Sequence, residues 1–166
     1  MMIPLAPTLS VCGAIFIWTA SPSIGVDPDS AEEQTVQCDD VPAAVRTAFG
    51  KSFPKATVRS CVKEEEMGKS AYEVSSTEGK TTRDVLFDPD GALLVVAEAI
   101  AAAGLPKAVK QTWEKKFANY TIVLVEKVMR QNEVTYEIQS THLGKLSENV
   151  FDGNGTELTG LISPPR

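Results

Sequence analysis

Hydrophobic side chains recur at every fourth residue in two short segments, and this spacing predicts an amphipathic helix in each. The two stripes consist of Val41, Val45, Phe49 and Phe53, and of Leu105, Val109, Trp113 and Phe117. Residues at this spacing share one side of a helix, so each helix is expected to bury that side against a core. Pro42 and Pro106 fall in the first turn, where a missing N–H is tolerated, and Asp40 can cap the first helix.

Each predicted helix is followed by segments in which apolar and polar residues alternate, as in half-buried strands. The first strand of each set is irregular, because its apolar residues lie three positions apart, and this predicts a β-bulge. The third strands end in the turns Asp88-Pro89-Asp90-Gly91 and Asp152-Gly153-Asn154-Gly155. The expected strands are 56–65, 71–77, 83–88 and 92–97, and then 120–129, 135–141, 147–152 and 156–162.

The chain also matches itself at a spacing of 64 residues. Residues 41–94 align with 105–158 without a gap, and about fifteen pairs are identical, whereas chance would give roughly three. The sequence therefore predicts an α+β fold of two tandem repeats, each a helix plus a four-strand antiparallel meander. The two repeats are expected either to share a continuous sheet or to pack against each other, with both helices on one sheet face and a wet, polar opposite face. The predicted domains are an acidic linker at 26–40, repeats at 41–98 and 99–162, and a short tail at 163–166.

Composition and charge narrow the function classes. A hydrophobic content of 43% in 166 residues supports a globular core, and a net charge of −6 argues against a nucleic-acid partner. The chain has one histidine and no glycine-rich phosphate loop, so we expect a protein that is not an enzyme and needs no cofactor. Residues 1–25 carry no charge and include an apolar run of ten residues at 11–20.

That run is too short to cross a membrane, which takes about twenty apolar residues, and it predicts a signal peptide cleaved after Gly25. The alternatives are a misassigned start codon and an uncleaved apolar tail, because no Lys or Arg precedes the run. A cleaved leader would place the mature chain in the periplasm or outside the cell. No stable membrane span is expected in that mature chain.

Three groups of residues could suggest chemistry, and each has a simpler structural explanation. The two Asp- and Gly-containing turns resemble part of a calcium loop, but hairpin turns explain the same residues and no metal is expected. Glu64, Glu65 and Glu66 are interpreted as a solvated hairpin end and not as catalytic carboxylates. His142 has no nearby Cys, Asp or Ser in the sequence and is interpreted as a surface histidine.

Two cysteines, Cys38 and Cys61, remain after the predicted leader. They either form a disulfide in an oxidising compartment, or Cys61 is a small buried residue and Cys38 is free. The best candidates for contact with a partner are polar residues expected to point outward from the sheet. They are Glu73, Ser75, Glu137, Gln139, Lys63 and Lys127. Cross-strand ion pairs on a wet sheet face are the alternative explanation for the Glu and Lys residues.

The segments VPAAVRTAFGKSFPKATV, YEV and VLFDPDGALL, together with LPKAVKQTWEKKFANYTI, YEI and VFDGNGTEL, resemble the PepSY-like family of β-lactamase-inhibitor-like proteins. The resemblance covers nearly all of the predicted mature chain. It implies a secreted or periplasmic bacterial protein that binds a protein or peptide in the cell envelope and inhibits or regulates it, a peptidase being one such partner. The alternative is an envelope module that senses a small ligand or a metal ion in the groove between repeats.

Overall fold

All eight strands of the described chain join one antiparallel sheet, in the same order as they occur in the sequence. The computed structural model describes residues 33–66 and 68–158, and in these ranges no helix is long and apolar enough to span a membrane. In chain order the elements are β1 (Gln34–Val36), α1 (Ala43–Ser52), β2 (Thr57–Glu66), β3 (Lys69–Glu78), β4 (Thr81–Phe87), β5 (Leu93–Ala99), η1 (Ala102–Gly104), α2 (Lys107–Lys116), β6 (Thr121–Arg130), β7 (Glu133–His142) and β8 (Lys145–Asp152).

The prediction of two helix-plus-four-strand repeats is wrong. The sheet is continuous, because β5 pairs directly with β6, for example at Val96 and Met129. Pairing at this position leaves neither half with an exposed edge strand in the middle of the molecule. The last predicted strand is also absent from the described residues, where 156–158 contribute only the isolated bridge between Phe151 and Glu157.

An additional strand, β1, pairs with β2 inside the segment that was expected to be a solvated linker. That expectation is wrong for residues 34–36, where the backbone pairing of an edge strand outweighs the acidic composition. The predicted signal peptide at 1–25, the first part of the linker and the tail at 163–166 lie outside the described residues.

Helices and strands in the two parts of the sheet nevertheless begin at positions 64 residues apart. We call the part with α1 and β2–β5 (41–99) the α1 half, and the part with α2 and β6–β8 (105–158) the α2 half. The predicted bulges are confirmed, between Val58 and Ser60 in β2 and between Ile122 and Leu124 in β6. Asp40 does not cap α1, since the N-cap residues are prolines and neither helix has a side-chain cap.

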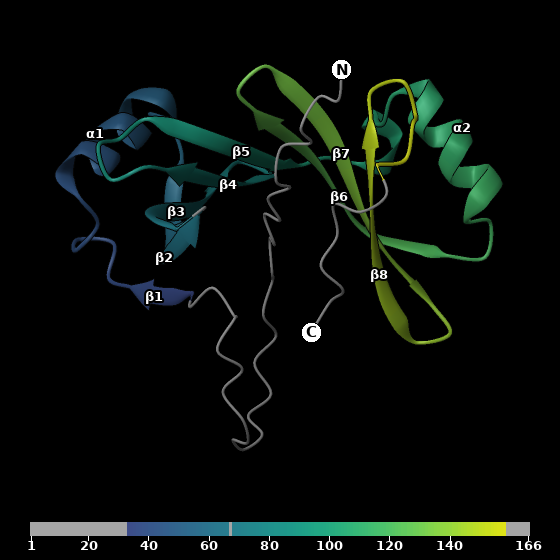
Figure 1. Ribbon diagram of the computed structural model, residues 1–166, viewed down its shortest axis with the longest axis horizontal. Helices are drawn as coiled ribbons and strands as arrows, with labels where there is room; N and C mark the ends of the chain where they lie inside the picture. The colour runs from purple at the N-terminus through teal and green to yellow at the C-terminus, as the bar shows by residue number, and fades with distance from the viewer. Residues whose placement is uncertain (1–32, 67, 159–166) are drawn as a thin grey trace, which may run out of the picture.

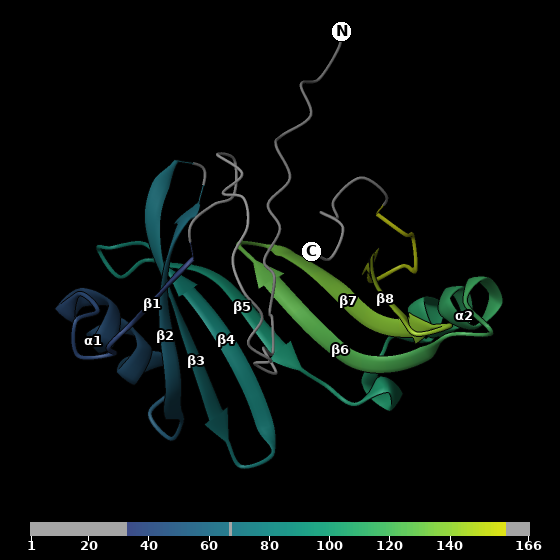
Figure 2. The same ribbon diagram turned by 90° about the horizontal axis from the view of Figure 1, so that it is seen from below.

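Both helices lie on the same side of the sheet, one toward each end (Figure 1). Under α1, the core contains Val45 and Phe49 packed with strand residues such as Phe87. Under α2, Val109 and Trp113 pack with strand residues such as Phe151. The predicted helical stripes therefore do face a core, and the sheet bends between the two helices (Figure 2).

The opposite side of the sheet, which we call the open face, is not uniformly wet as expected. Its centre is a buried apolar cluster of Ala71, Leu86, Val95, Ala97 and Val128, contributed by four neighbouring strands. Side chains alternate along a strand, so residues two positions from these also belong to the open face. That relationship places a set of carboxylates around the apolar centre.

Candidate binding surface on the sheet

Carboxylates from five strands lie on the open face. Glu73 is two residues from Ala71 on β3, and Asp84 is two residues from Leu86 on β4. Glu126 is two residues from Val128 on β6 and pairs with Glu137 on β7. Glu148 on β8 pairs with Gln139, which is two residues from Glu137. We call Glu73, Asp84, Glu126, Glu137 and Glu148 the carboxylate cluster.

The Glu126–Glu137 pair brings two like charges directly opposite each other. Side chains at such positions have Cβ atoms about 5 Å apart, and opposed like charges destabilise a sheet. Glu126 is only 5% exposed. Within residues 33–66 and 68–158, no hydrogen bond or ion pair reaches its carboxylate. The fold thus keeps a buried acidic group without the partner that burial normally requires.

Burial and mutual repulsion hold these carboxyl groups closer to their protonated forms. Burial raises the pKa of Glu126 to about 7, and neighbouring Asp84 and Glu148 add to the effect. Burial also raises the pKa of Glu73 to about 8, with Asp84 the strongest of four neighbouring carboxylates that raise it further. These groups exchange protons near neutral pH, so their charge depends on what approaches them.

Glu137 and Glu148 follow the same pattern on the last two strands. Burial raises the pKa of Glu137 to about 8, helped by Glu148 and Glu126 and opposed by the positive charge of Arg130. Burial raises the pKa of Glu148, while a hydrogen bond from Gln139 lowers it. Three carboxyl groups with raised pKa therefore lie where β6, β7 and β8 run side by side.

The residues proposed from the sequence separate onto the two faces. Glu73, Ser75, Glu137 and Gln139 lie on the open face, where Ser75 pairs with Asp84 across β3 and β4. Lys63 and Lys127 instead pair with Tyr72 and Tyr136, whose rings pack against the helix-side cores. Cross-strand pairs between these lysines and Glu73 or Glu137 are therefore not formed, since the side chains point to opposite faces.

Sequence reasoning missed Asp84, Glu126 and Glu148. Asp84 and Glu148 occupy counterpart positions 64 residues apart, a signal that was available in the repeat alignment. Glu126 has Val62 as its counterpart, so the repeat gave no indication of an acidic residue there. Only the pairing of β6 with β7 reveals that it lies opposite Glu137.

A bulky apolar residue lies at the tip of the hairpin between β7 and β8. Leu143 is 89% exposed and has a backbone φ of 50°, a left-handed conformation that disfavours large side chains. Its counterpart in the α1 half is Gly79, which adopts φ 63° with no such cost. Leu146, 48% exposed, pairs with Thr141 and lies on the open face two residues from Glu148.

The remaining chemical candidates serve the local fold. The Asp88 carboxylate accepts hydrogen bonds from the backbone N–H groups of Asp90 and Ala92 at 3.0 and 2.8 Å. The carboxylate of Asp152 makes the equivalent bonds at 2.9 and 2.8 Å in the second turn. Gly91 and Gly155 have positive φ in these turns, and a Cβ on either would collide with a helix carbonyl. The turn interpretation is confirmed.

His142 lies at the edge of the core under α2, where it contacts Tyr120. Its ring stacks on Tyr120 with centroids 4.6 Å apart, and its Nδ1 donates to the carbonyl oxygen of Asn119 at 2.9 Å. In the acidic run, Glu65 is exposed at the end of the β2–β3 hairpin, where it pairs with Ser70. Among the described residues, no group of three Asp, Glu, His or Cys side chains has an arrangement that could hold a metal ion.

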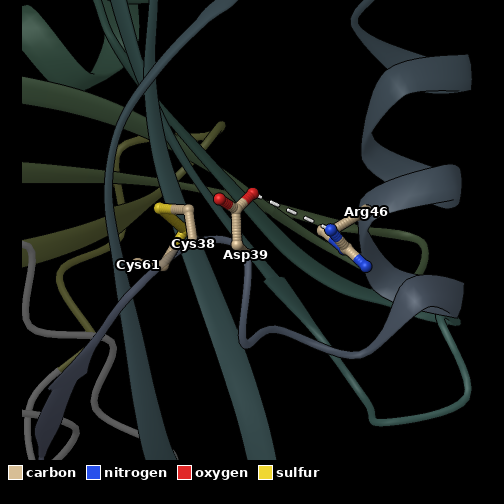
Figure 3. The surroundings of a disulfide bond; sticks show 4 residues. All are labelled: Cys38, Asp39, Arg46 and Cys61. Carbon is tan, nitrogen blue, oxygen red and sulfur yellow. Dashed lines mark ion pairs between the residues drawn. A yellow bond between two sulfur atoms is a disulfide. The ribbon is translucent and has the colours of Figure 1, made fainter.

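Of the two alternatives for the cysteines, the structure contains the disulfide. Cys38 and Cys61 are bonded, with their Cα atoms 5.3 Å apart (Figure 3). Next to it, Asp39 lies 3.8 Å from the guanidinium of Arg46 on α1. The bond connects the residues after β1 to the middle of β2, on the helix side of the sheet, and so stabilises the edge of the α1 half.

Comparison with solved structures identifies proteins of the same fold. A candidate periplasmic protein from Bacteroides eggerthii is 18% identical over 71% of this chain and 86% of its own, with a TM-score of 0.63. A DUF2874 family protein from Bacteroides ovatus is 19% identical over 72% and 86%, with a TM-score of 0.61. A BLIP-like protein from Bacteroides fragilis is 21% identical over 70% and 83%, with a TM-score of 0.57.

No family model matches the sequence, and no curated protein matches it either. The PepSY-like resemblance therefore stays a prediction. At these identities the solved structures establish a shared fold, and this chain shares that fold with a BLIP-like protein and with a DUF2874 family protein.

Proposed function

We propose that this chain is a periplasmic protein without enzymatic activity that binds a protein partner through the open face of its sheet. The observation that carries the proposal is the carboxylate cluster. Glu126 and Glu137 are held directly opposite each other, and Glu126 is buried without a cationic partner in the described part of the chain. A rigid sheet that retains such a costly arrangement is well suited to receive positive charge from another molecule.

The periplasmic location has two main supports, and a disulfide adds to them. One is the predicted signal peptide at 1–25, and the other is the fold shared with a candidate periplasmic protein from Bacteroides eggerthii. A disulfide between Cys38 and Cys61 is typical of an oxidising compartment. Binding would inhibit or regulate the partner, as the PepSY-like resemblance implies, with a peptidase as one such partner.

The absence of enzymatic activity is supported by the way the acid–base groups are used. His142 is engaged by Tyr120 and by a backbone carbonyl, and the turn aspartates accept backbone hydrogen bonds. The carboxylates of the open face are raised in pKa mainly by burial, and most of the charged neighbours that shift them are other carboxylates. They form an acidic surface across neighbouring strands.

Site-specific photo-crosslinking in the periplasm tests this proposal. A photoreactive amino acid at Gln139 would report contacts of the open face, and the same group at Lys110 on α2 would report the helix side as the matched control. We expect a defined cross-linked protein from Gln139 and none from Lys110. Cross-links from Lys110 alone would overturn the assignment of the binding face.

A further inference from the structure

We propose that the α2 half of the open face is the docking surface, and that its occupant is a polypeptide segment carrying basic residues next to an exposed apolar residue. This inference rests on the proposed function and adds the half of the sheet and the chemistry of the partner. It is argued from the β7–β8 hairpin tip, from the charges beside it and from the counterpart positions in the α1 half.

The first step concerns Leu143. A leucine at positive φ stores backbone strain, and strain that persists in a fold is a reason to look for function. Folding does not explain this leucine, because it is 89% exposed and Gly79 makes the counterpart turn without strain. A hairpin that presents a leucine to solvent offers an apolar contact for an exposed apolar residue of a partner.

The second step concerns what surrounds the leucine. Leu146 lies on the open face, and Glu148 follows two residues later, about 7 Å along the same strand. Val123, 59% exposed, lies at the bulge of β6 near the same end of the sheet. The apolar tip therefore leads directly into the carboxylate cluster, and the hairpin extends away from α2 (Figure 1).

The third step is charge. Glu148, Glu137 and Glu126 form a continuous acidic path from the tip toward the centre of the sheet. Asp84 and Glu73 extend it into the α1 half, and Arg130 offsets part of it near Glu137. Since Glu126 is buried and has no cation of its own in the described chain, complementarity calls for lysine or arginine on the partner. Nucleic acids and anionic lipids carry the wrong sign.

The counterpart positions show that this combination is particular to the α2 half. Where the α2 half has Leu143, Leu146 and Glu126, the α1 half has Gly79, Thr82 and Val62. Asp84 and Glu73 give the α1 half an acidic character as well, but it lacks an apolar tip. An acidic sheet would attract any basic chain, whereas the leucine tip selects one with an apolar residue at the correct distance.

A labelled peptide of alternating lysine and leucine residues is the probe, and fluorescence anisotropy with the purified protein measures its affinity. The variants are Glu137→Gln, which removes a charge from the path, and Leu143→Gly, which introduces the residue of the counterpart turn. Glu114→Gln on the exposed side of α2 is the matched charge control, and Thr82→Ala is the control for the α1 half. Glu73→Gln tests whether the α1 half contains the site instead. An alternating glutamate–leucine peptide controls for apolar stickiness.

We expect saturable binding of the basic peptide, weakened roughly tenfold by Glu137→Gln and severalfold by Leu143→Gly. Both controls should bind as the unmodified protein does, and the acidic peptide should not bind. Absence of saturable binding would overturn the inferred partner chemistry. Weakening by Glu73→Gln with no effect of Glu137→Gln or Leu143→Gly would move the site to the α1 half and leave the proposed function intact. If Glu114→Gln alone weakened peptide binding, the peptide would be binding on the helix side, and the open face would be overturned as the binding surface.

Discussion

The two halves of the sheet use different chemistry at counterpart positions. In the α1 half, the guanidinium of Arg83 lies 2.8 Å from Glu98, 3.6 Å from Glu78 and over the ring of Phe53 at 4.6 Å. In the α2 half, His142 replaces Glu78 and stacks on Tyr120. One hairpin is therefore secured to its core by ion pairs, and the other by aromatic stacking.

The two halves share one backbone arrangement. The difference shows that the same positions can stabilise the fold at one end of the sheet and remain available for binding at the other. The α1 half contains the ion pairs around Arg83, and its edge strand β2 is joined to the added strand β1 and to Cys38 through the disulfide. The α2 half contains the strained leucine tip and two open-face carboxylates directly opposite each other, Glu126 and Glu137. The disulfide stabilises the edge of the first half, whereas the strained tip and the opposed glutamates cost stability in the second.

The largest expected effect tests whether the two halves unfold as one cooperative unit. Phe87→Ala and Phe151→Ala each delete a fully buried ring from one of the two helix-side cores. Each should reduce the free energy of unfolding by about 3–5 kcal/mol. Because β5 pairs with β6, urea denaturation should still show one cooperative transition for both variants. Two separate transitions would show that the halves unfold independently.

Removing the disulfide should affect the α1 half next most strongly. Cys61→Val introduces the residue found at the counterpart position, Val125, and Cys38→Ser removes the other thiol. The double variant should lose about 3 kcal/mol of unfolding free energy, since the bond closes a loop of 23 residues in sequence separation. Thermal unfolding with and without reductant provides the control, and reductant should lower only the unmodified protein's Tm.

The carboxylate cluster predicts that stability falls as the pH rises. A carboxyl group whose pKa is raised in the folded state holds a proton there that the unfolded chain has already lost. The stabilisation is complete below about pH 4.5 and disappears as the pH passes the folded values of about 7 for Glu126 and about 8 for Glu137. The unfolding free energy should therefore decrease between pH 5 and pH 9.

Glu126→Gln sharpens this test. At pH 9 the variant should be about 1–3 kcal/mol more stable than the unmodified protein, because a buried charge is no longer formed. At pH 4.5 the two should differ little. Urea unfolding at both pH values is the measurement, and Glu114→Gln on the exposed side of α2 is the control. Equal effects of the two substitutions at pH 9 would contradict the assigned burial of Glu126.

The smallest effect concerns the hairpin tip. Leu143→Gly should raise the unfolding free energy by about 1 kcal/mol, since glycine adopts positive φ without steric cost. A differential scanning calorimetry trace should show a Tm increase of a few degrees, whereas Gly79→Leu in the α1 half should lower it. If Leu143→Gly destabilised the protein, the leucine would be contributing to folding and not to recognition.

The local structure was largely predictable from the sequence. Every-fourth-residue stripes identified α1 and α2, and the three-residue apolar spacing identified both bulges. The overall architecture was predictable only in part. A sheet shared by the two parts was one of two expected arrangements, but the pairing of β5 with β6 leaves no periodic signal that selects it. β1 was missed because three residues in an acidic, aromatic-free segment are too few to show alternation.

The candidate surface was predictable only in part. Alternation placed Glu73, Ser75, Glu137 and Gln139 correctly on the face away from the helices. It failed for Lys63 and Lys127, since a residue's side of the sheet depends on the bulge that precedes it in β2 and β6. Glu126 could not be found, because the opposition of two glutamates on separate strands exists only once the register is known.

The most direct test of the account is a carbon NMR titration of the Glu126 and Glu137 carboxyl groups, with and without the lysine–leucine peptide. In the free protein both groups should titrate near neutral pH, at about 7 and about 8. With peptide bound, both values should fall by a unit or more, because a nearby cation favours the ionised form. Titration near 4.5 in the free protein, or pKa values unchanged by the peptide, would contradict the claim that this buried acidic pair binds a basic partner.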